Sequence, residues 1–335
     1  MKHNINKISI LGDGGWGTTL ALLLNSKGFS VTLWSAFKEY TAILNKGREN
    51  TRYLPGFNIP EPIVISDDIH EAISDAQLVV VAIPSQHLRN ILVESKIGNL
   101  TSKKVLSVIK GVEQNTFKRP SEILKEELAI SDVAVLSGPT IALELANGLP
   151  TSAVIAADGP ELAMLMQEVF MSETLRIYAS ADVIGVELGG ALKNIMAIAA
   201  GISDGLGLGT NAKASLFTRG LVEMKRVGFA LGGSIDTFNG LSGMGDLVTT
   251  CVSKHSRNRH VGEEIAKGKK LDQILKEMVM VAEGVDTSKS VYELSKRLNI
   301  QTPITDQVYK VLFEDKNPLK AVKELMKRDR KSEAV

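Results

Sequence analysis

The chain has 335 residues, enough for two domains, and a formal net charge of +1, which removes the electrostatic argument for nucleic acid or an anionic membrane surface as a partner. A single cysteine, Cys251, excludes a disulfide framework and a multi-thiolate metal site and suits a reducing cytoplasm. The longest strongly apolar stretch, residues 78–84, is far shorter than the roughly 20 residues of a transmembrane helix. The N-terminus lacks the apolar core of a signal peptide, so we expect a cytoplasmic protein without stable membrane insertion.

The first predicted element is a strand at residues 8–11, which leads directly into Gly12-x-Gly14-x-x-Gly17 and a helical stretch over 18–27. In this context Gly12 allows a tight turn, Gly14 lets the backbone approach a pyrophosphate, and Gly17 lets the helix pack closely on the sheet. The free N–H groups of the helix N-terminus favour phosphate. The motif therefore predicts a bound dinucleotide; the alternative is a tight strand-to-helix turn with no ligand.

Short β-branched runs continue through the first half of the chain, and helical patterns such as 67–75 and 120–129 separate several of them. The predicted strands after the first are 30–34, 78–83, 105–109, 133–136 and 152–156. Runs that are apolar throughout suit strands buried on both faces. Their alternation with helices predicts a parallel, doubly wound sheet of the Rossmann type.

The pattern changes near residue 180, after which helical periodicity dominates. Helices are predicted at 182–201, 211–231, 257–268, 271–279, 284–298, 303–313 and 318–328. We therefore expect a dinucleotide-binding domain over 1–180 and an all-α, substrate-binding domain over 181–335. In such a protein the substrate would lie between the domains, at the carboxyl ends of the strands.

Lys193 is the candidate catalytic residue of the first long helix. Its helical neighbours at three and four positions include no acidic residue, so the usual surface ion pair is absent. The adjacent Gly189 and Gly190 cost about 1 kcal/mol each in a helix, which suggests a close approach to the backbone there. A lysine in an apolar surround has a lowered pKa and can act as a base. The alternative is a lysine whose amine extends to water from a packing helix.

A second candidate site is the segment Ser256-Arg257-Asn258-Arg259, whose donors at a helix start suit a phosphate. Lys110 and the turn Ser137-Gly-Pro-Thr140 follow two predicted strands, where side chains point into a ligand crevice. A basic loop and ordinary turns are the alternatives. Asp246, after a glycine-rich turn, reads by default as a turn former or N-cap. Metal-ligand spacing is absent from the sequence, so no metal is expected.

Together these blocks resemble the bacterial-type NAD(P)-dependent glycerol-3-phosphate dehydrogenases over nearly the whole chain. The resemblance rests on an ordered set: Gly12-Asp-Gly-Gly-Trp-Gly-Thr, Leu33-Trp34, Tyr53-Leu-Pro, Ala82-Ile-Pro-Ser, Lys110-Gly, Ser137-Gly-Pro-Thr, Glu144-Leu-Ala, Gly148-Leu-Pro-Thr, Gly189-Gly-Ala-Leu-Lys-Asn, Ser203-Asp-Gly, Gly243-Met-Gly-Asp, Ser256-Arg-Asn-Arg and Glu283-Gly. It implies a Rossmann-type domain followed by a helical domain, an arrangement like that of 6-phosphogluconate dehydrogenase. It also implies reduction of dihydroxyacetone phosphate to sn-glycerol 3-phosphate for phospholipid synthesis. The sequence does not give the oligomeric state, and a homodimer is our expectation.

By the same resemblance Lys193 is the proton donor in reduction and the acceptor in oxidation. The implied substrate-binding residues are Lys110, Gly138, Thr140, Lys193, Asp246, Ser256, Arg257 and Asn258. The implied cofactor-binding residues are Gly12, Gly14, Gly15, Trp16, Gly17, Tyr53, Lys110, Ala142, Arg257, Val281 and Glu283.

This chain departs from the family pattern at two places near the cofactor. Gly15 replaces the common serine, and Ser35-Ala36 replace the Arg or His that usually follows the Trp of the second strand to hold the NADP 2′-phosphate. Neither of these two positions holds an acidic residue that could accept a hydrogen bond from the NAD ribose. Lys38 is one basic residue that could replace the missing Arg or His as a partner of the NADP 2′-phosphate. The sequence therefore leaves NADP(H) and NAD(H) both open, with the resemblance favouring NADPH.

Two other functions stay open on the residues. One is another two-domain NAD(P)-dependent dehydrogenase of a small phosphorylated substrate; a nucleotide-sugar dehydrogenase would need Cys251 as its catalytic thiol. The other is a nicotinamide-sensing protein without turnover, which would need neither Lys193 nor a phosphate pocket.

Overall fold

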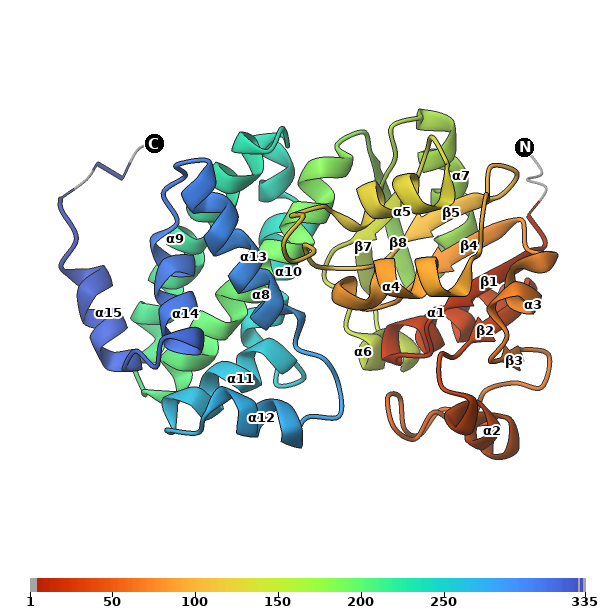
Figure 1. Cartoon of the computed structure of the whole chain (residues 1–335), viewed down its shortest axis with the longest axis horizontal. Coiled ribbons are helices and arrows are strands. Elements are labelled where there is room, and N and C mark those ends of the chain that lie inside the picture. Colours follow the sequence, from red (N-terminus) through yellow and green to blue (C-terminus); the bar gives the residue numbers. More distant parts are fainter. Residues whose placement is uncertain (1–4, 331, 334–335) are drawn as a thin grey trace.

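The computed structural model describes residues 5–330 and 332–333, and it has a sheet-containing lobe and a helical lobe (Figure 1). The strands of the first lobe are β1 (Lys7–Leu11), β2 (Ser30–Trp34), β3 (Val64–Ser66), β4 (Leu78–Val81), β5 (Lys104–Ser107), β6 (Ala134–Ser137), β7 (Thr151–Ala156) and β8 (Leu175–Ser180). Its helices are α1 (Gly15–Ser26), α2 (Lys38–Gly47), α3 (Ile69–Ser74), α4 (Ser85–Ser95), α5 (Pro120–Leu128), α6 (Ala142–Ala146) and α7 (Pro160–Phe170).

All these strands form one sheet in the order β3-β2-β1-β4-β5-β6-β7-β8, which confirms the predicted doubly wound fold. Neighbouring strands are parallel except β6 and β7, which are antiparallel, so the prediction of a parallel sheet is wrong for this pair. A parallel crossover needs a connection that carries the chain back along the whole strand. Between β6 and β7 the only helix is α6, whose five residues are too short for that return.

Two strands were missed by the sequence pattern, and both lie at edges of the sheet. β3 has only three residues. β8 alternates buried and exposed side chains, with Arg176 and Tyr178 on its outer face. An edge strand with one solvated face carries a weaker apolar signal than a central strand buried on both faces.

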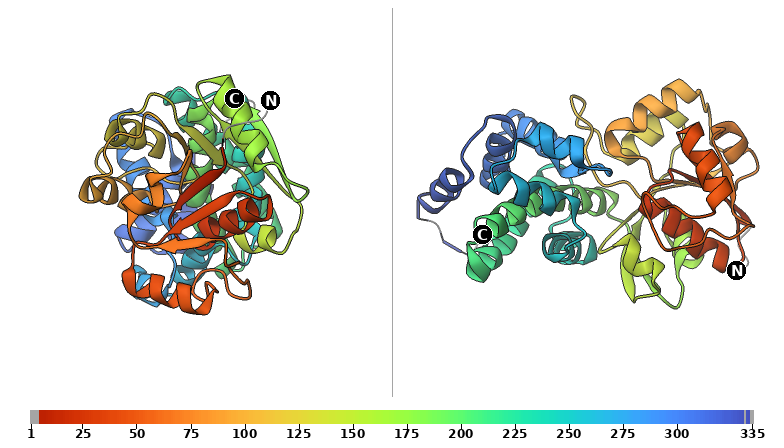
Figure 2. Two further views of the ribbon diagram at one scale, coloured as in Figure 1. Left: turned by 90° about the vertical axis from the view of Figure 1, so that its right-hand side faces the viewer. Right: turned by 90° about the horizontal axis from the view of Figure 1, so that it is seen from below.

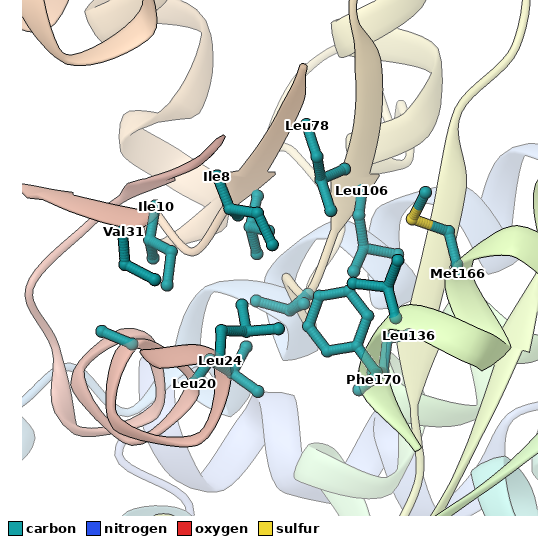
Figure 3. Packing of buried hydrophobic residues seen from close by; sticks show 14 of the residues in the cluster. Ile8, Ile10, Leu20, Leu24, Val31, Leu78, Leu106, Leu136, Met166 and Phe170 are labelled. Atoms are coloured by element: carbon teal, nitrogen blue, oxygen red, sulfur yellow. The ribbon is translucent and has the colours of Figure 1, made fainter. Parts of the chain in front are cut away.

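The alternation of the central strands fills a core on each face of the sheet. On one face, Leu78 and Val80 of β4 join the cluster that includes α1 and α7, which Figure 3 shows around Phe170. On the other face, Val79 and Val81 pack with residues of α3, α4 and α5. Helices on both faces leave the carboxyl ends of the strands as the open edge.

The helical lobe follows β8 directly. Its α-helices are α8 (Val183–Gly205), α9 (Gly209–Ala230), α10 (Asp246–Val252), α11 (Arg257–Ala266), α12 (Leu271–Glu277), α13 (Glu283–Arg297), α14 (Pro303–Phe313) and α15 (Pro318–Met326). A 3-10 turn, η1 (Ile235–Asn239), and a π-helical turn, η2 (Leu241–Gly245), precede α10. The helical character confirms the prediction for this part of the chain, although α10 was not predicted.

Helix α8 is the core of the helical lobe, which Figure 2 shows from two further sides, and it packs against α9, α10, α11, α13 and α14. It is the one helix in the described part of the chain that is long and apolar enough to span a membrane, and the sequence analysis did not single it out. Because 89% of its most apolar window is buried inside the protein, it is a core helix of this lobe.

Glycines let α11 cross close to α8. A Cβ atom on Gly201 would lie 1.9 Å from the Arg259 carbonyl oxygen, and one on Gly262 would lie 2.1 Å from the Ile198 carbonyl oxygen. This backbone-to-backbone packing sets the first turn of α11 beside Asn194, the residue after the candidate catalytic lysine.

Candidate active site

The glycine loop lies where the chain order of the sheet reverses. β1 has β2 on one side and β4 on the other, and the amide of Gly12 donates to the Trp34 carbonyl at 3.1 Å. Gly12 has a φ of +123°, and a Cβ on it would lie 2.6 Å from the Ala82 carbonyl oxygen. The end of β1 is thus held tightly against the ends of β2 and β4, at the crevice where open α/β sheets bind ligands.

The loop fits a dinucleotide pyrophosphate. A Cβ on Gly17 would lie 2.0 Å from the Gly12 carbonyl oxygen, so this position needs glycine for packing. In contrast, a Cβ on Gly14 would meet no atom within 4 Å, so the backbone there is open to a ligand. Gly14 is the N-cap of α1 and gives that helix no side-chain cap. The amides of the first turn are therefore available for an anion.

Other predicted cofactor residues surround this loop. A Cβ on Gly15 would lie 2.7 Å from the Tyr53 carbonyl oxygen and 3.7 Å from the Ala142 Cβ. The hydroxyl of Thr19 also donates to the Ala142 carbonyl at 3.2 Å. The indole Nε1 of Trp16 is buried and has no hydrogen-bond partner in the described chain. A buried donor without a partner next to an open loop fits a site that takes a polar ligand.

Lys193 sits at the centre of a compact polar cluster, only 6% exposed. Its Nζ donates to Asp246 Oδ1 at 2.8 Å and to Thr250 Oγ1 at 2.6 Å. The hydroxyl of Thr250 in turn donates to Asp246 Oδ1 at 3.0 Å. The interpretation that Lys193 extends to water is therefore wrong, because α8 buries it and α10 supplies its partners.

Lys110 holds the other oxygen of the same carboxylate. Its Nζ donates to Asp246 Oδ2 at 2.6 Å, to the Gly138 carbonyl at 2.9 Å and to Thr140 Oγ1 at 3.0 Å. These three acceptors account for all three N–H groups of its ammonium, whereas the bonds of Lys193 account for two. The default reading of Asp246 as a turn former or N-cap is wrong, because Gly245 is the N-cap and the carboxylate binds two lysines.

The adjacent glycines of α8 make this cluster possible. A Cβ on Gly189 would lie 2.5 Å from the Ser242 carbonyl oxygen, in the π-helical turn η2. One on Gly190 would lie 2.3 Å from Ser137 Oγ and 3.3 Å from Lys110 Cγ. The close approach that the two glycines suggested is thus present, and it brings β6 and η2 to the lysine.

The electrostatics of the cluster favour proton exchange at Lys193. The pKa of Lys193 is lowered to about 8: burial is the main cause and the charge of Lys110 adds to it, while Asp246 opposes the decrease. The pKa of Asp246 is lowered because the two ammonium groups outweigh its own burial. Asp246 therefore stays ionised, and Lys193 can titrate near neutral pH.

The first turn of α11 lies beside this cluster. Asn258 is buried; its Nδ2 donates to Asn194 Oδ1 at 2.9 Å, and its Oδ1 accepts from the Gly284 amide at 2.9 Å. Ser256 caps the helix by accepting from the Arg259 amide at 3.2 Å, as the sequence indicated. Arg257 is exposed and is attracted electrostatically to Glu283. Within this segment, Arg257 is therefore the residue whose side chain is free to contact a ligand that enters from solvent.

Glu283 joins the two lobes at the N-terminus of α13. Its Oε1 accepts from the amide of Ser85, the first residue of α4, at 2.9 Å. Val281, two residues earlier, is exposed. Both residues therefore lie at the boundary between the lobes, near the end of β4.

Sequence reasoning missed two members of the cluster. Thr250 lies on α10, which was not predicted. Its position four residues after Asp246, one turn of a helix, is the signal that could have identified it. Asn194 was visible beside Lys193 but was given no role. A group of three or more His, Cys, Asp or Glu side chains that could hold a metal is absent from the described residues.

Comparisons with known proteins show the family of this chain. Residues 7–163 match the model of the NAD-dependent glycerol-3-phosphate dehydrogenase N-terminus, and residues 182–323 match that of its C-terminus. The chain is 50% identical over 330 residues to "Glycerol-3-phosphate dehydrogenase [NAD(P)+]" of Chlorobium phaeobacteroides, covering 98% of this chain and 99% of the relative. It is 47% identical over 332 residues to the protein of the same name from Geobacillus thermodenitrificans, covering 98% and 97%.

Solved structures show the same similarity. Glycerol-3-phosphate dehydrogenase from Coxiella burnetii superposes with a TM-score of 0.93 at 36% identity, covering 97% of this chain and 99% of that one. A ketopantoate reductase from Ralstonia eutropha, with 17% identity and a TM-score of 0.61, shares the fold. The regions that match the two family models include all the residues of the site described above. Because these models and the full-length relatives cover nearly the whole chain, the chain belongs to the NAD-dependent glycerol-3-phosphate dehydrogenase family.

Proposed function

We propose that this protein is an NAD(P)-dependent oxidoreductase that reduces dihydroxyacetone phosphate to sn-glycerol 3-phosphate, with Lys193 as the proton donor. The single observation that carries the proposal is the buried pair of Lys193 and Asp246, which Lys110 joins to the sheet-containing lobe. Full-length relatives near 50% identity that bear the name of this activity support it.

The cluster leaves one N–H group of Lys193 for a substrate. Thr250 and Asp246 accept two of its three protons, and because both lie on α10 they fix the direction of the third. A carbonyl oxygen that accepts this third proton would be polarised for attack at its carbon. We therefore assign Lys193 to the substrate oxygen and Lys110 and Asp246 to holding and tuning it.

The phosphate of the substrate would bind at the first turn of α11. Arg257 offers a guanidinium whose fork geometry suits phosphate, and the amides of the helix N-terminus add donors. Ser256 and Asn258 are occupied by contacts within the protein, so they shape this turn. Binding energy from the remote phosphate would hold the carbonyl at Lys193.

The chemistry needs a hydride and a proton. A nicotinamide cofactor held at the glycine loop of residues 12–17 would supply the hydride. As the carbonyl carbon is reduced, its oxygen takes the proton of Lys193, which becomes a neutral amine, while Asp246 stays ionised beside Lys110. Oxidation of the alcohol runs the same proton back to the neutral amine of Lys193, which acts as the base.

The direct test follows the consumption of NADH and NADPH by the purified protein with dihydroxyacetone phosphate, and identifies the product as glycerol 3-phosphate. Lys193→Met should lower kcat by at least about 100-fold, the scale of general acid catalysis. Lys193→Arg is the matched variant: it keeps the charge but cannot give up a proton near neutral pH, so it should be equally slow. Absence of turnover with both cofactors, or near-normal turnover in either variant, would refute the assignment.

Arg257→Ala tests the phosphate site. It should raise KM for dihydroxyacetone phosphate by about 10-fold or more, because it removes a charge-assisted bond to phosphate. Arg219→Ala, at an exposed arginine of α9, is the control and should leave KM unchanged. Equal KM values for both variants would remove Arg257 from the site.

The cellular setting is part of the proposal. We infer a cytoplasmic enzyme that forms a homodimer and whose product feeds phospholipid synthesis. A nicotinamide sensor without turnover would have no use for the cluster at Lys193. A dehydrogenase of another small phosphorylated substrate stays the alternative, and a panel of phosphorylated ketones and aldehydes in the same assay separates the two.

A further inference from the structure

A buried acidic side chain lies at the adenosine end of the cofactor crevice. Asp13 is the second residue of the glycine loop, and it is only 7% exposed. Its Oδ2 accepts a hydrogen bond from Ser35 Oγ at 2.9 Å. Ser35 follows β2 directly and is fully buried. The carboxylate of Asp13 thus stands at the end of β2, although it comes from the end of β1.

The end of β2 is the position from which dinucleotide-binding folds read the adenosine ribose. An acidic residue there binds the ribose 2′-hydroxyl of NAD, and a nearby arginine accommodates the 2′-phosphate of NADP. In this chain neither residue type stands at Ser35 or Ala36. The hydroxyl of Ser35 donates its proton to Asp13, so it cannot donate to a 2′-phosphate at the same time.

Asp13 is held in place by the segment after α2. Its carbonyl oxygen accepts from Asn50 Nδ2 at 2.7 Å and from Thr18 Oγ1 at 3.1 Å. Asn50 is itself fixed by the hydroxyl of Tyr40, which donates to its Oδ1 at 2.7 Å. These bonds hold the backbone of Asp13 in place, and the bond from Ser35 orients its carboxylate.

Arg52 is a basic side chain whose charge acts on Asp13. Its guanidinium lies 5.2 Å from the ring centre of Tyr53 and 5.9 Å from that of Tyr40, and it is exposed. Burial raises the pKa of Asp13, while Ser35 and Arg52 oppose that rise. Arg52 thus helps to keep the carboxylate ionised.

We propose that Asp13 takes the role of the missing acidic residue after β2, and that it makes this protein select NAD(H) over NADP(H). An ionised carboxylate can accept the ribose 2′-hydroxyl and repels a 2′-phosphate at the same place. The inference rests on the proposed function only in that a nicotinamide dinucleotide binds the glycine loop. The opposing possibility is that Arg52 binds the 2′-phosphate, and the test separates the two.

The experiment measures the Kd of the full-length protein for NADH and NADPH by titration calorimetry, together with ADP-ribose and its 2′-phosphorylated form. The wild type should bind the forms without the 2′-phosphate about 10- to 100-fold more tightly. Asp13→Asn keeps the shape and an acceptor for Ser35 and should reduce that ratio by about 10-fold or more. Asp272→Asn, an exposed carboxylate on α12, is the control and should leave the ratio unchanged.

Arg52→Ala decides the competing assignment. If Arg52 only supports Asp13, its loss should not selectively weaken the binding of NADPH or of 2′-phosphorylated ADP-ribose. Selective loss of those ligands in Arg52→Ala, a wild-type preference for NADPH, or an unchanged ratio in a folded Asp13→Asn protein would each overturn the inference. Failure of the wild type to bind any of the four ligands would instead refute the proposed function itself. If Asp13→Asn does not fold, the wild-type ratio and Arg52→Ala still decide.

Discussion

Replacing Asp246 by asparagine should change the pH at which Lys193 gives up its proton. The substitution keeps the shape of the side chain and removes the charge that lies 2.8 Å from Lys193 Nζ and 2.6 Å from Lys110 Nζ. Since Asp246 raises the pKa of Lys193 against burial and Lys110, its loss should lower that pKa from about 8.

The size of the effect follows from the contact. An opposite charge at this distance typically changes a pKa by about 1 to 3, so the pKa of Lys193 should decrease to about 6. Near pH 7.5 the protonated fraction of Lys193 would then decrease from about three quarters to about 3%. We therefore expect kcat/KM for ketone reduction near pH 7.5 to decrease by about 25-fold from titration alone.

The assay records kcat/KM across pH in both directions. Reduction needs the protonated amine, so in the wild type it should decline as the pH rises through about 8. Oxidation needs the neutral amine, so it should increase over the same range. In Asp246→Asn both limbs should move to lower pH, and at low pH part of the lost reduction should return. Limbs that stay near pH 8 in a variant with native circular dichroism would refute the role of Asp246.

Three further predictions concern stability and reactivity. Burial in α9 raises the pKa of the Glu223 carboxyl to about 7, so protonation of Glu223 stabilises the folded state. The free energy of unfolding should therefore decrease by about 3 kcal/mol as the pH rises from about 4.5 through 7. Urea titrations should show this decrease in the wild type and not in Glu223→Gln. Gly201→Ala should destabilise by about 1 to 3 kcal/mol despite better helix propensity, because its Cβ would lie 1.9 Å from the Arg259 carbonyl oxygen. Gly47→Ala, where a Cβ meets nothing within 4 Å, is its control in the same urea assay and should not destabilise; an equal loss in both would contradict the packing argument. Burial raises the pKa of the Cys251 thiol to about 12, so iodoacetamide should label it only after unfolding, and rapid labelling of the native protein would show that the residue is accessible.

Much of the fold could be predicted because its signals are local. The glycine loop, the central strands and most helices of the second lobe repeat patterns within ten or twenty residues. Continuous apolar runs mark strands buried on both faces, which is why β4 was readable and the edge strand β8 was not. The lysine was also a local deduction: Lys193 lacks acidic neighbours on its own helix and follows two costly glycines.

What the tertiary structure decided are the pairs that lie far apart in the chain. Asp246 is 53 residues from Lys193 and 136 from Lys110, and only the packing of α10 and η2 against α8 brings the three together. No short-range pattern distinguishes such an aspartate from a turn former. The reversal of β7 depends likewise on what a short α6 can span, which is a property of the packed chain.

The same distinction holds for the cofactor end of the site. The sequence by itself determined that residues 12–17 form a tight loop between a strand and a helix, since that backbone requires glycine at positions 12 and 17. It left the end of β2 without a charged residue. The folded chain places the carboxylate of Asp13 there through its bond to Ser35, because the ends of parallel strands meet at one edge of a sheet whatever their distance in the sequence.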